Sequence, residues 1–243
     1  MENKKETKSE IKGIIRAYNE LVKGIDLKAS NQLGDENARA YGGVLRAGKG
    51  KLVESITREL IELAWSELGG DPKRLSFEKK TIKIPIKKEY IEEMENPDVK
   101  KFIKENLDKF HYNFRADVHV QIDEKLIIGI ECKAYTENAM LKRILVDFTF
   151  LKQIFPSTKN VLIQLESQLG GDYFDIAKEI THGSYSTHTI MSYFDVDLII
   201  ITLLEGERKV DKAIHKKGYF KELKKENLEK AIKVFKEIMS DSI

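Results

Sequence analysis

Two carboxylates and an ammonium are predicted to meet on neighbouring strands near the middle of the chain. The stretch Phe114–Lys133 predicts two antiparallel strands joined by a loop at residues 123–125. The register pairs apolar residues on one face: Ile122 with Leu126, Val120 with Ile128, Val118 with Ile130 and Ala116 with Cys132. On the opposite face it places Asp117 across from Glu131, with Lys133 two residues further along. Directly opposed β-carbons lie about 4.5 to 5.5 Å apart, so a divalent cation with oxygen ligands at about 2.0 to 2.6 Å fits between the carboxylates.

An Asp on one strand, followed on the next by an acidic residue, any residue and Lys, resembles the motif of the PD-(D/E)XK nuclease superfamily. Here the motif is Ala116-Asp117 and Glu131-Cys132-Lys133. The resemblance is strongest to type II restriction endonucleases, whose size and organisation the chain shares. The Pro that commonly precedes the Asp in this family is Ala116 here, at a position that varies. The motif covers only the hairpin, and acidic-x-Lys strings are common in a chain with 34% charged residues, so a surface hairpin with a charged outer face is the alternative interpretation.

The resemblance implies hydrolysis of phosphodiester bonds with Mg²⁺, for which Mn²⁺ can substitute. Asp117, Glu131 and the backbone carbonyl of Cys132 would be the oxygen ligands, a donor type that suits Mg²⁺. Lys133 would position or polarise the attacking water and balance the charge that builds on the phosphate. In this family the helix before the first core strand often contributes another acid, which makes Glu54 a candidate metal partner through water. The alternative is that Glu54 is only an acid favourably placed at a helix N-terminus.

Composition is typical of one soluble domain spanning residues 1–243, with 41% hydrophobic residues. The net charge of +2 is too small to indicate a nucleic-acid partner by itself. No apolar run reaches the ~18 residues of a membrane span, and the polar first residues do not resemble a signal peptide, so we expect a cytoplasmic protein with no membrane association. The single cysteine excludes an internal disulfide framework and a Cys-rich zinc module.

The spacing of apolar residues predicts an α/β fold, a mixed central β-sheet flanked by helices, which is the restriction-endonuclease-like core that the resemblance implies. The predicted helices are Thr7–Lys23, Leu52–Leu68, two short ones at Lys88–Glu95 and Asp98–Lys109, Asn138–Ile154 and Lys221–Met239. The predicted strands besides the hairpin are Ser76–Ile86, Asn160–Leu165 and Val196–Leu204. The glycine-punctuated stretch Asp26–Gly50 is predicted to be a loop around at most a short helix, and Glu166–Asp195 to be irregular or partly helical.

DNA contacts are expected outside the hairpin. A recognition insertion is predicted at about residues 166–195, which is rich in Gly, Ser, Thr and Tyr, and an N-terminal helical and loop elaboration at about residues 1–50. Candidate contacts in the insertion are Asp172, His182, Ser184, Ser186 and His188, and candidate phosphate contacts are Arg46, Lys49, Lys142 and Arg143. The alternatives are a plain packed loop and merely solvated basic residues. Gly129 on the functional face either gives the substrate room or marks a β-bulge.

Together these patterns predict a Mg²⁺-dependent, site-specific endonuclease that cleaves double-stranded DNA. A homodimer is expected, because the two strands of a palindromic site require two symmetric active sites. One alternative keeps the fold but changes the substrate, as in a structure-selective repair or recombination nuclease such as a Holliday-junction resolvase. The other is a non-catalytic DNA-binding module of the same fold.

Overall fold

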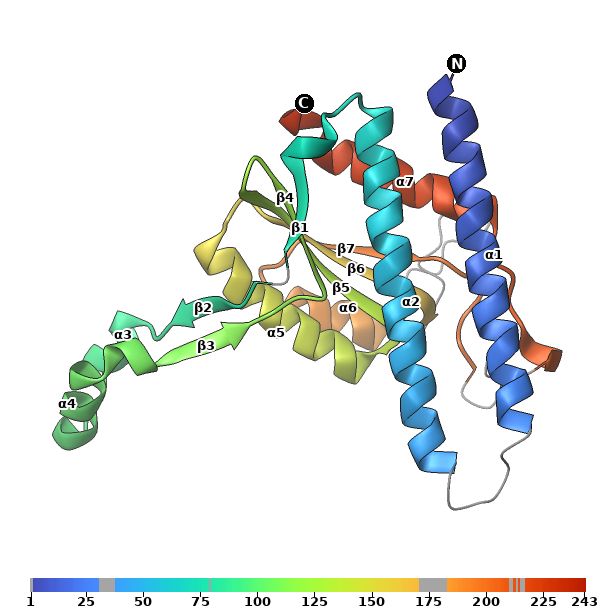
Figure 1. Ribbon diagram of the computed structural model, residues 1–243. Helices are drawn as coiled ribbons and strands as arrows, with labels where there is room; N and C mark the ends of the chain where they lie inside the picture. The colour runs from blue at the N-terminus through green and yellow to red at the C-terminus, as the bar shows by residue number, and fades with distance from the viewer. Residues whose placement is uncertain are drawn as a thin grey trace.

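A five-stranded sheet lies between two layers of helices in the computed structural model (Figure 1). The structure describes residues 2–30, 38–78, 80–170, 183–209, 212, 214 and 217–243, and within these it describes no side chains for 2–6, 25–30, 38–47 and 217. The strands are β1 (Leu75–Glu78), β2 (Ile82–Pro85), β3 (His111–Phe114), β4 (Val118–Ile122), β5 (Lys125–Glu137), β6 (Lys159–Gln168) and β7 (Leu198–Thr202). The α-helices are α1 (Glu2–Ser30), α2 (Ala38–Glu67), α3 (Lys88–Glu92), α4 (Pro97–Glu105), α5 (Asn138–Ile154), α6 (Tyr185–Ser192) and α7 (Lys225–Met239). Short 3-10 helices are η2 (Pro72–Arg74), η3 (Leu107–Lys109), η4 (Lys217–Tyr219) and η5 (Ser240–Ser242).

The main sheet is mixed, with the strand order β1-β4-β5-β6-β7. β4 pairs antiparallel with both of its neighbours, β1 and β5, whereas β6 pairs parallel with β5 and β7 pairs parallel with β6. The crossover from β5 to β6 is made by α5, as parallel neighbours require. The predicted mixed α/β fold is confirmed.

Each face of the sheet is buried under its own helices. One cluster of buried side chains joins α1, α2 and α7 to the face that carries Val118, Ile130 and Cys132. A second cluster joins α5 to the opposite face, where it includes Leu162. Full burial of one such aliphatic side chain contributes about 1.5 to 3 kcal/mol, so the two clusters hold β5 rigidly between two layers. Among the described residues, no helix combines the length and the apolarity that crossing a membrane requires.

Both N-terminal helices are longer than the sequence predicted. α1 continues to Ser30 and α2 begins at Ala38, so the prediction of a loop over Asp26–Gly50 with at most a short helix is wrong. The glycines of this stretch lowered the predicted helical tendency by about 1 kcal/mol each. The second half of α2 packs in the core, and extension of an existing helix costs far less than its nucleation, so core packing can support the whole length of α2. A β-carbon at Gly48 or Gly50 would meet no atom within 4 Å, so neither glycine is required by packing.

The predicted strand Ser76–Ile86 is two strands in two different sheets. β1 pairs with β4 in the main sheet, whereas β2 pairs with β3 in a separate two-stranded sheet. Residues 82–114 project away from the main sheet, and we call this projection the arm (Figure 1). It consists of β2, α3, α4, η3 and β3. Alternation of apolar and polar residues is the same in both strands and therefore could not show that the partner changes.

The β4–β5 hairpin confirms two of the predicted pairs, and its register begins at Val118, one residue after Asp117. Val118 pairs with Ile130 and Val120 with Ile128. At the other end the prediction is wrong, because Ile122 pairs with Lys125 rather than Leu126, and the register shifts between Val120 and Gln121. The turn has two residues, not three: Asp123 and Glu124 both adopt positive φ, at 50° and 65°, as in the tight turns that match strand twist.

Gly129 allows α5 to approach the sheet. A β-carbon there would lie 2.8 Å from Cδ2 of Leu151 and 3.3 Å from Cε1 of Phe148, both on α5. The substrate therefore has no room at Gly129, contrary to one of the two expectations. The register shift also lies further along the hairpin, so it does not explain the glycine either.

Candidate active site

Asp117 lies where the chain enters β4. The N–H of Ala116 donates to Nε2 of His119 at 3.2 Å, and the ring of His119 stacks on Phe114 with 5.9 Å between centroids. Burial, with a smaller contribution from Arg115, lowers the pKa of His119, so a neutral ring accepts this hydrogen bond. The predicted pairing of Ala116 with Cys132 is wrong. Ala116 packs on the α5 side of the sheet, whereas Cys132 packs on the α2 side.

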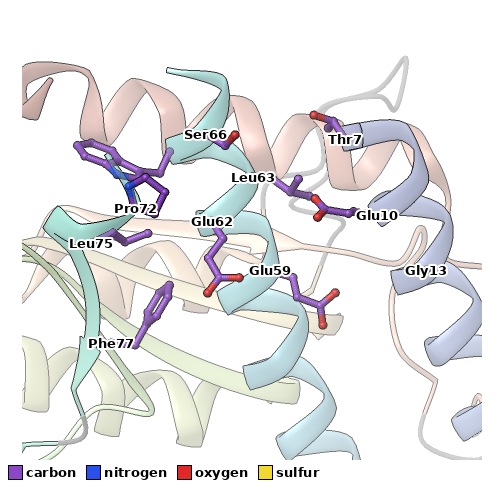
Figure 2. A pocket seen from close by; sticks show the side chains of 11 residues that line it. Thr7, Glu10, Gly13, Glu59, Glu62, Leu63, Ser66, Pro72, Leu75 and Phe77 are labelled. Carbon is purple, nitrogen blue, oxygen red and sulfur yellow. The ribbon is translucent and has the colours of Figure 1, made fainter. Parts of the chain in front are cut away.

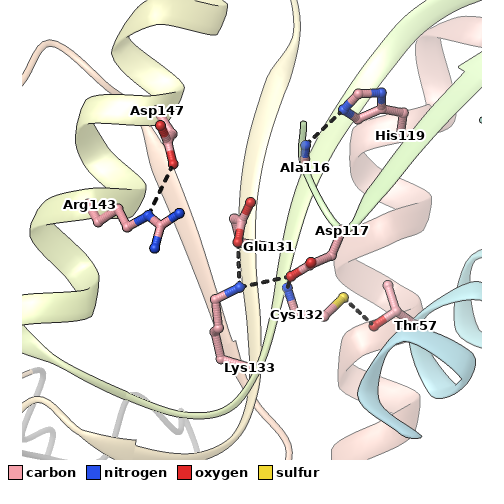
Figure 3. Close-up of polar contacts among 9 residues, drawn as sticks. All are labelled: Thr57, Ala116, Asp117, His119, Glu131, Cys132, Lys133, Arg143 and Asp147. Atoms are coloured by element: carbon pink, nitrogen blue, oxygen red, sulfur yellow. Dashed lines mark hydrogen bonds and ion pairs between the residues drawn. The ribbon is translucent and has the colours of Figure 1, made fainter. Parts of the chain in front are cut away.

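The predicted convergence of Asp117, Glu131 and Lys133 is present (Figure 3). Nζ of Lys133 lies 2.8 Å from Oδ2 of Asp117 and 2.5 Å from Oε2 of Glu131. Oδ2 of Asp117 also accepts the N–H of Cys132 at 2.8 Å, which holds the carboxylate against β5. The Glu131 side chain is only 10% exposed, while those of Asp117 and Lys133 are 30% and 29% exposed. The cluster is therefore half-buried, with Asp117 and Lys133 partly exposed to solvent.

This cluster has more negative charge than its ammonium can neutralise. Burial raises the pKa of Glu131, with repulsion from Asp117 and Asp147 adding to the effect, although Lys133 opposes it. Burial alone would lower the pKa of Lys133, but Glu131 and Asp117 outweigh burial and raise it to about 12. Two carboxylates and one ammonium leave a formal charge of −1. A divalent cation would compensate that charge, and carboxylate oxygens are donors that Mg²⁺ accepts, so the residues fit the expected metal.

Within the described part of the chain, no three His, Cys, Asp or Glu side chains gather closely enough to hold a metal ion. The fit therefore depends on a backbone donor beside the two carboxylates. The N–H of Cys132 points to Asp117, and in an extended strand the N–H and C=O of one residue point to the same side. The carbonyl of Cys132 is thus directed to the side of β5 on which Asp117 lies.

The thiol of Cys132 has a structural role on the opposite face. It is buried against α2, with Sγ 3.5 Å from Oγ1 of Thr57. Burial is the main cause that raises the pKa of this thiol, and the negative charges of Asp117 and Glu54 add to it. Glu54 therefore lies within electrostatic reach of the site. It stands in the middle of α2, not at a helix N-terminus, so the alternative explanation given for this acid is wrong.

Comparison with known proteins shows the family. The chain is 51% identical over 237 residues to the type II restriction enzyme DdeI of Desulfomicrobium norvegicum (strain DSM 1741 / NCIMB 8310), an alignment that covers 97% of this chain and 98% of that one. The chain belongs to the type II restriction enzymes. It is therefore a restriction endodeoxyribonuclease, as the hairpin motif predicted. No family model matches the chain. A chain of the solved structure described as the native BbvCI A2B2 tetramer at low resolution aligns with a TM-score of 0.36 and 12% identity, over 99% of this chain and 91% of that one.

Asp147 lies within electrostatic reach of the candidate cluster, and sequence reasoning missed it. It lies on α5, accepts the hydroxyl of Tyr112 at 2.6 Å and contributes to raising the pKa of Glu131. Nε of Arg143, one helical turn earlier, is 4.0 Å from Oδ2 of Asp147 (Figure 3). The i,i+4 spacing of Arg143 and Asp147 is visible in the sequence, but their position beside β5 is not.

The candidate phosphate contacts differ in exposure. Lys142 and Arg143 are exposed on the first half of α5, where DNA at the site could reach them. Lys49 is buried, and burial lowers its pKa while the charge of Glu166 raises it, which argues against the predicted role as an exposed phosphate contact. Arg46 lies in α2, but its side chain is outside the described part. Glu166 itself belongs to β6 and pairs with Lys221 at 3.0 Å, so the predicted insertion cannot begin there.

In the predicted recognition segment, two serines hold α6 in place. Oγ of Ser184 accepts the N–H of Thr187 at 3.2 Å and caps α6. Oγ of Ser186 accepts Nδ2 of Asn138 at 3.0 Å, which joins α6 to the start of α5. His188 is exposed on the same helix. Asp172 and His182 fall outside the described residues.

A pocket of about 590 Å³ lies away from these catalytic candidates, between α1, α2 and β1 (Figure 2). Carboxylates of Glu10, Glu59 and Glu62 line it beside apolar side chains such as Phe77. Burial and the neighbouring charge of Glu59 raise the pKa of Glu62. Such a negative lining repels the phosphates of DNA, so this pocket is not a candidate DNA site.

Proposed function

We propose that this restriction enzyme cleaves both strands of DNA at one recognition sequence, with Mg²⁺ held by Asp117, Glu131 and the carbonyl of Cys132. The observation that carries the proposal is the half-buried, partly exposed cluster with a formal charge of −1, in which one ammonium is shared by two carboxylates. Mn²⁺, with the same preference for oxygen ligands, can substitute. The high identity to a type II restriction enzyme over nearly the full chain favours this function over a junction resolvase or a non-catalytic module.

The chain's own residues supply the remaining chemistry. When bound, Mg²⁺ would supply positive charge for the scissile phosphate and lower the pKa of a coordinated water. Lys133 has three N–H donors, of which two are directed to Asp117 and Glu131, so the third can hold the attacking water or a phosphate oxygen. The N–H of Cys132 keeps Asp117 oriented while substrate enters. Arg143 is exposed on α5 one helical turn before Asp147, whose charge acts on Glu131, and can neutralise a phosphate of the bound strand.

We further propose a homodimer, because each chain carries one such cluster and double-strand cleavage of a symmetric site needs two. Residues 1–50 and the segment between the end of β6 and about residue 195 would be elaborations of one nuclease domain, with DNA approaching the ends of α5 and α6. Glu54 would contribute through water, as its position near Cys132 allows. Action in the cytoplasm, where incoming DNA is met, agrees with this function.

Digestion of plasmid and phage DNA tests the proposal. With Mg²⁺ the wild type should give discrete fragments, and with EDTA it should give none. Asp117→Ala and Glu131→Ala should abolish cleavage while retaining DNA binding in Ca²⁺, because removing a carboxylate reduces repulsion of phosphate. The matched control is Glu237→Ala, an exposed carboxylate paired with Lys233 at 3.8 Å on α7, which covers the face of the sheet opposite α5. Near wild-type cleavage by either cluster variant, or full activity in EDTA, would contradict the proposal.

A further inference from the structure

The arm carries an apolar surface that its own chain leaves uncovered. Val99 and Phe102 on α4, and Leu107 in η3, are 44%, 59% and 49% exposed. Figure 1 shows α3 and α4 at the far end of the arm, away from the helices that cover the main sheet. Large apolar side chains grouped on one exposed projection are typical of a surface that another macromolecule covers.

The charge of this end of the arm favours a protein over DNA as that partner. Residues 88–105, which we call the tip, contain four Lys and six Asp or Glu, a formal charge of −2 in a chain whose net charge is +2. Two of those lysines are also held by the tip itself, since Lys100 and Lys104 pair with Glu92 at 3.0 and 2.7 Å. DNA-binding surfaces instead carry an excess of unpaired Lys and Arg that face phosphates.

A groove with complementary properties lies at the base of the same arm. It has a volume of about 670 Å³ between the arm and α5. Its apolar walls include Ile84, Phe110 and Phe150, and the charged residues that line it are basic, Lys87 and Lys109 with His111 beside them, with no Asp or Glu among the lining residues. An acidic tip with apolar side chains matches this basic, apolar groove in both respects.

We propose that the arm is the dimerisation element, and that the tip of each copy docks in the groove at the base of the arm of a second copy. In reciprocal docking, where the tip of each copy lies in the groove of the other, the two contacts are related by a twofold axis and the assembly closes at two chains. This inference rests on the proposed function in one respect: cleavage of both DNA strands requires two active sites, and therefore two copies of the chain. Phe114 ends the arm three residues before Asp117, so arms docked in this way would hold the two catalytic clusters at a fixed spacing.

Sedimentation of the complete chain tests the contact. The wild type should sediment as a dimer, and Phe102→Lys should weaken association by roughly tenfold or more, as loss of a buried aromatic at an interface does. Phe102 also contacts the ring of Phe110 at 6.0 Å, so Val99→Lys serves as a second variant if the first perturbs folding. The matched control is Tyr193→Lys, which changes an 83% exposed aromatic at the end of α6 and should leave the dimer intact. A monomeric wild type, or a dimer unaffected by both tip variants, would overturn the inference.

Mixed cross-linking identifies which surfaces meet. Phe102→Cys on the tip and Gln153→Cys on the groove rim are purified separately, mixed and oxidised; the native Cys132 is buried and does not interfere. A reducible covalent pair that contains one of each variant is expected, and its absence when the wild type is a dimer would overturn the docking. The outcome is independent of catalysis. Dimers that do not cut DNA would refute the proposed cleavage alone, whereas cleavage by a monomer would refute the arm contact and the proposed homodimer but not the cleavage chemistry.

Discussion

Replacement of Lys133 by Met should separate metal binding from cleavage. The variant keeps the aliphatic stem and removes the ammonium that lies 2.8 Å from Asp117 and 2.5 Å from Glu131. The two carboxylate oxygens lie at most about 5 Å apart, because both contact one nitrogen. At an effective dielectric constant of about 20, two unit charges at that separation repel by about 3 kcal/mol. Partial exposure of Asp117 reduces this value, so we expect a loss of about 1 to 3 kcal/mol in the free energy of unfolding without metal at pH 8.

The same repulsion should make the variant bind a divalent cation more tightly. In thermal unfolding, Ca²⁺ should raise the melting temperature of Lys133→Met more than that of the wild type. Cleavage with Mg²⁺ should nevertheless fall by on the order of 10² or more, because the donor to the water and phosphate is lost. Lys236→Met is the matched control, since Lys236 pairs with Glu67 at 2.9 Å with similar exposure. Unchanged cleavage, or no extra stabilisation by Ca²⁺, would refute this assignment of Lys133.

Three further predictions concern the support of the site. Gly129→Ala should lower the free energy of unfolding by about 1 to 3 kcal/mol, measured in urea, because its β-carbon would overlap Leu151; an unchanged value would show that α5 does not pack so closely. His119→Phe should cost a similar amount, because it leaves the buried N–H of Ala116 without its acceptor. Since burial lowers the pKa of His119, wild-type stability should fall as pH drops below about 6.5, and His119→Phe should lack this component; an identical slope in the variant would contradict it. Cys132 should resist iodoacetamide at pH 8 until the protein unfolds, because burial raises its thiol pKa, and fast alkylation of native protein would argue otherwise.

The hairpin that carries the candidate site could be predicted because its two strands are adjacent in sequence. Alternation fixes which residues of β4 and β5 share a face, and that was sufficient to bring Asp117, Glu131 and Lys133 together. The error at the other end came from the turn. Two consecutive residues with positive φ are unusual for Asp-Glu, which carries no glycine to signal a two-residue turn.

Features that depend on distant contacts could not be predicted in this way. Asp147 reaches the site because α5 crosses back over the sheet, and the hydroxyl of Tyr112 meets it from the arm. The arm could not be predicted from the sequence, because β2 continues the apolar pattern of β1 but pairs with a different strand. The length of α2 likewise depends on the packing of its second half rather than on the glycines in its first.

Sequencing the ends of DNA cut in Mg²⁺ tests the central claim most directly. The account predicts that wild-type ends share one recurring sequence and that Asp117→Asn, assayed at the same concentration, produces no such ends. Ends without a common sequence, or the same ends from Asp117→Asn, would contradict a site-specific endonuclease whose active site is built on Asp117.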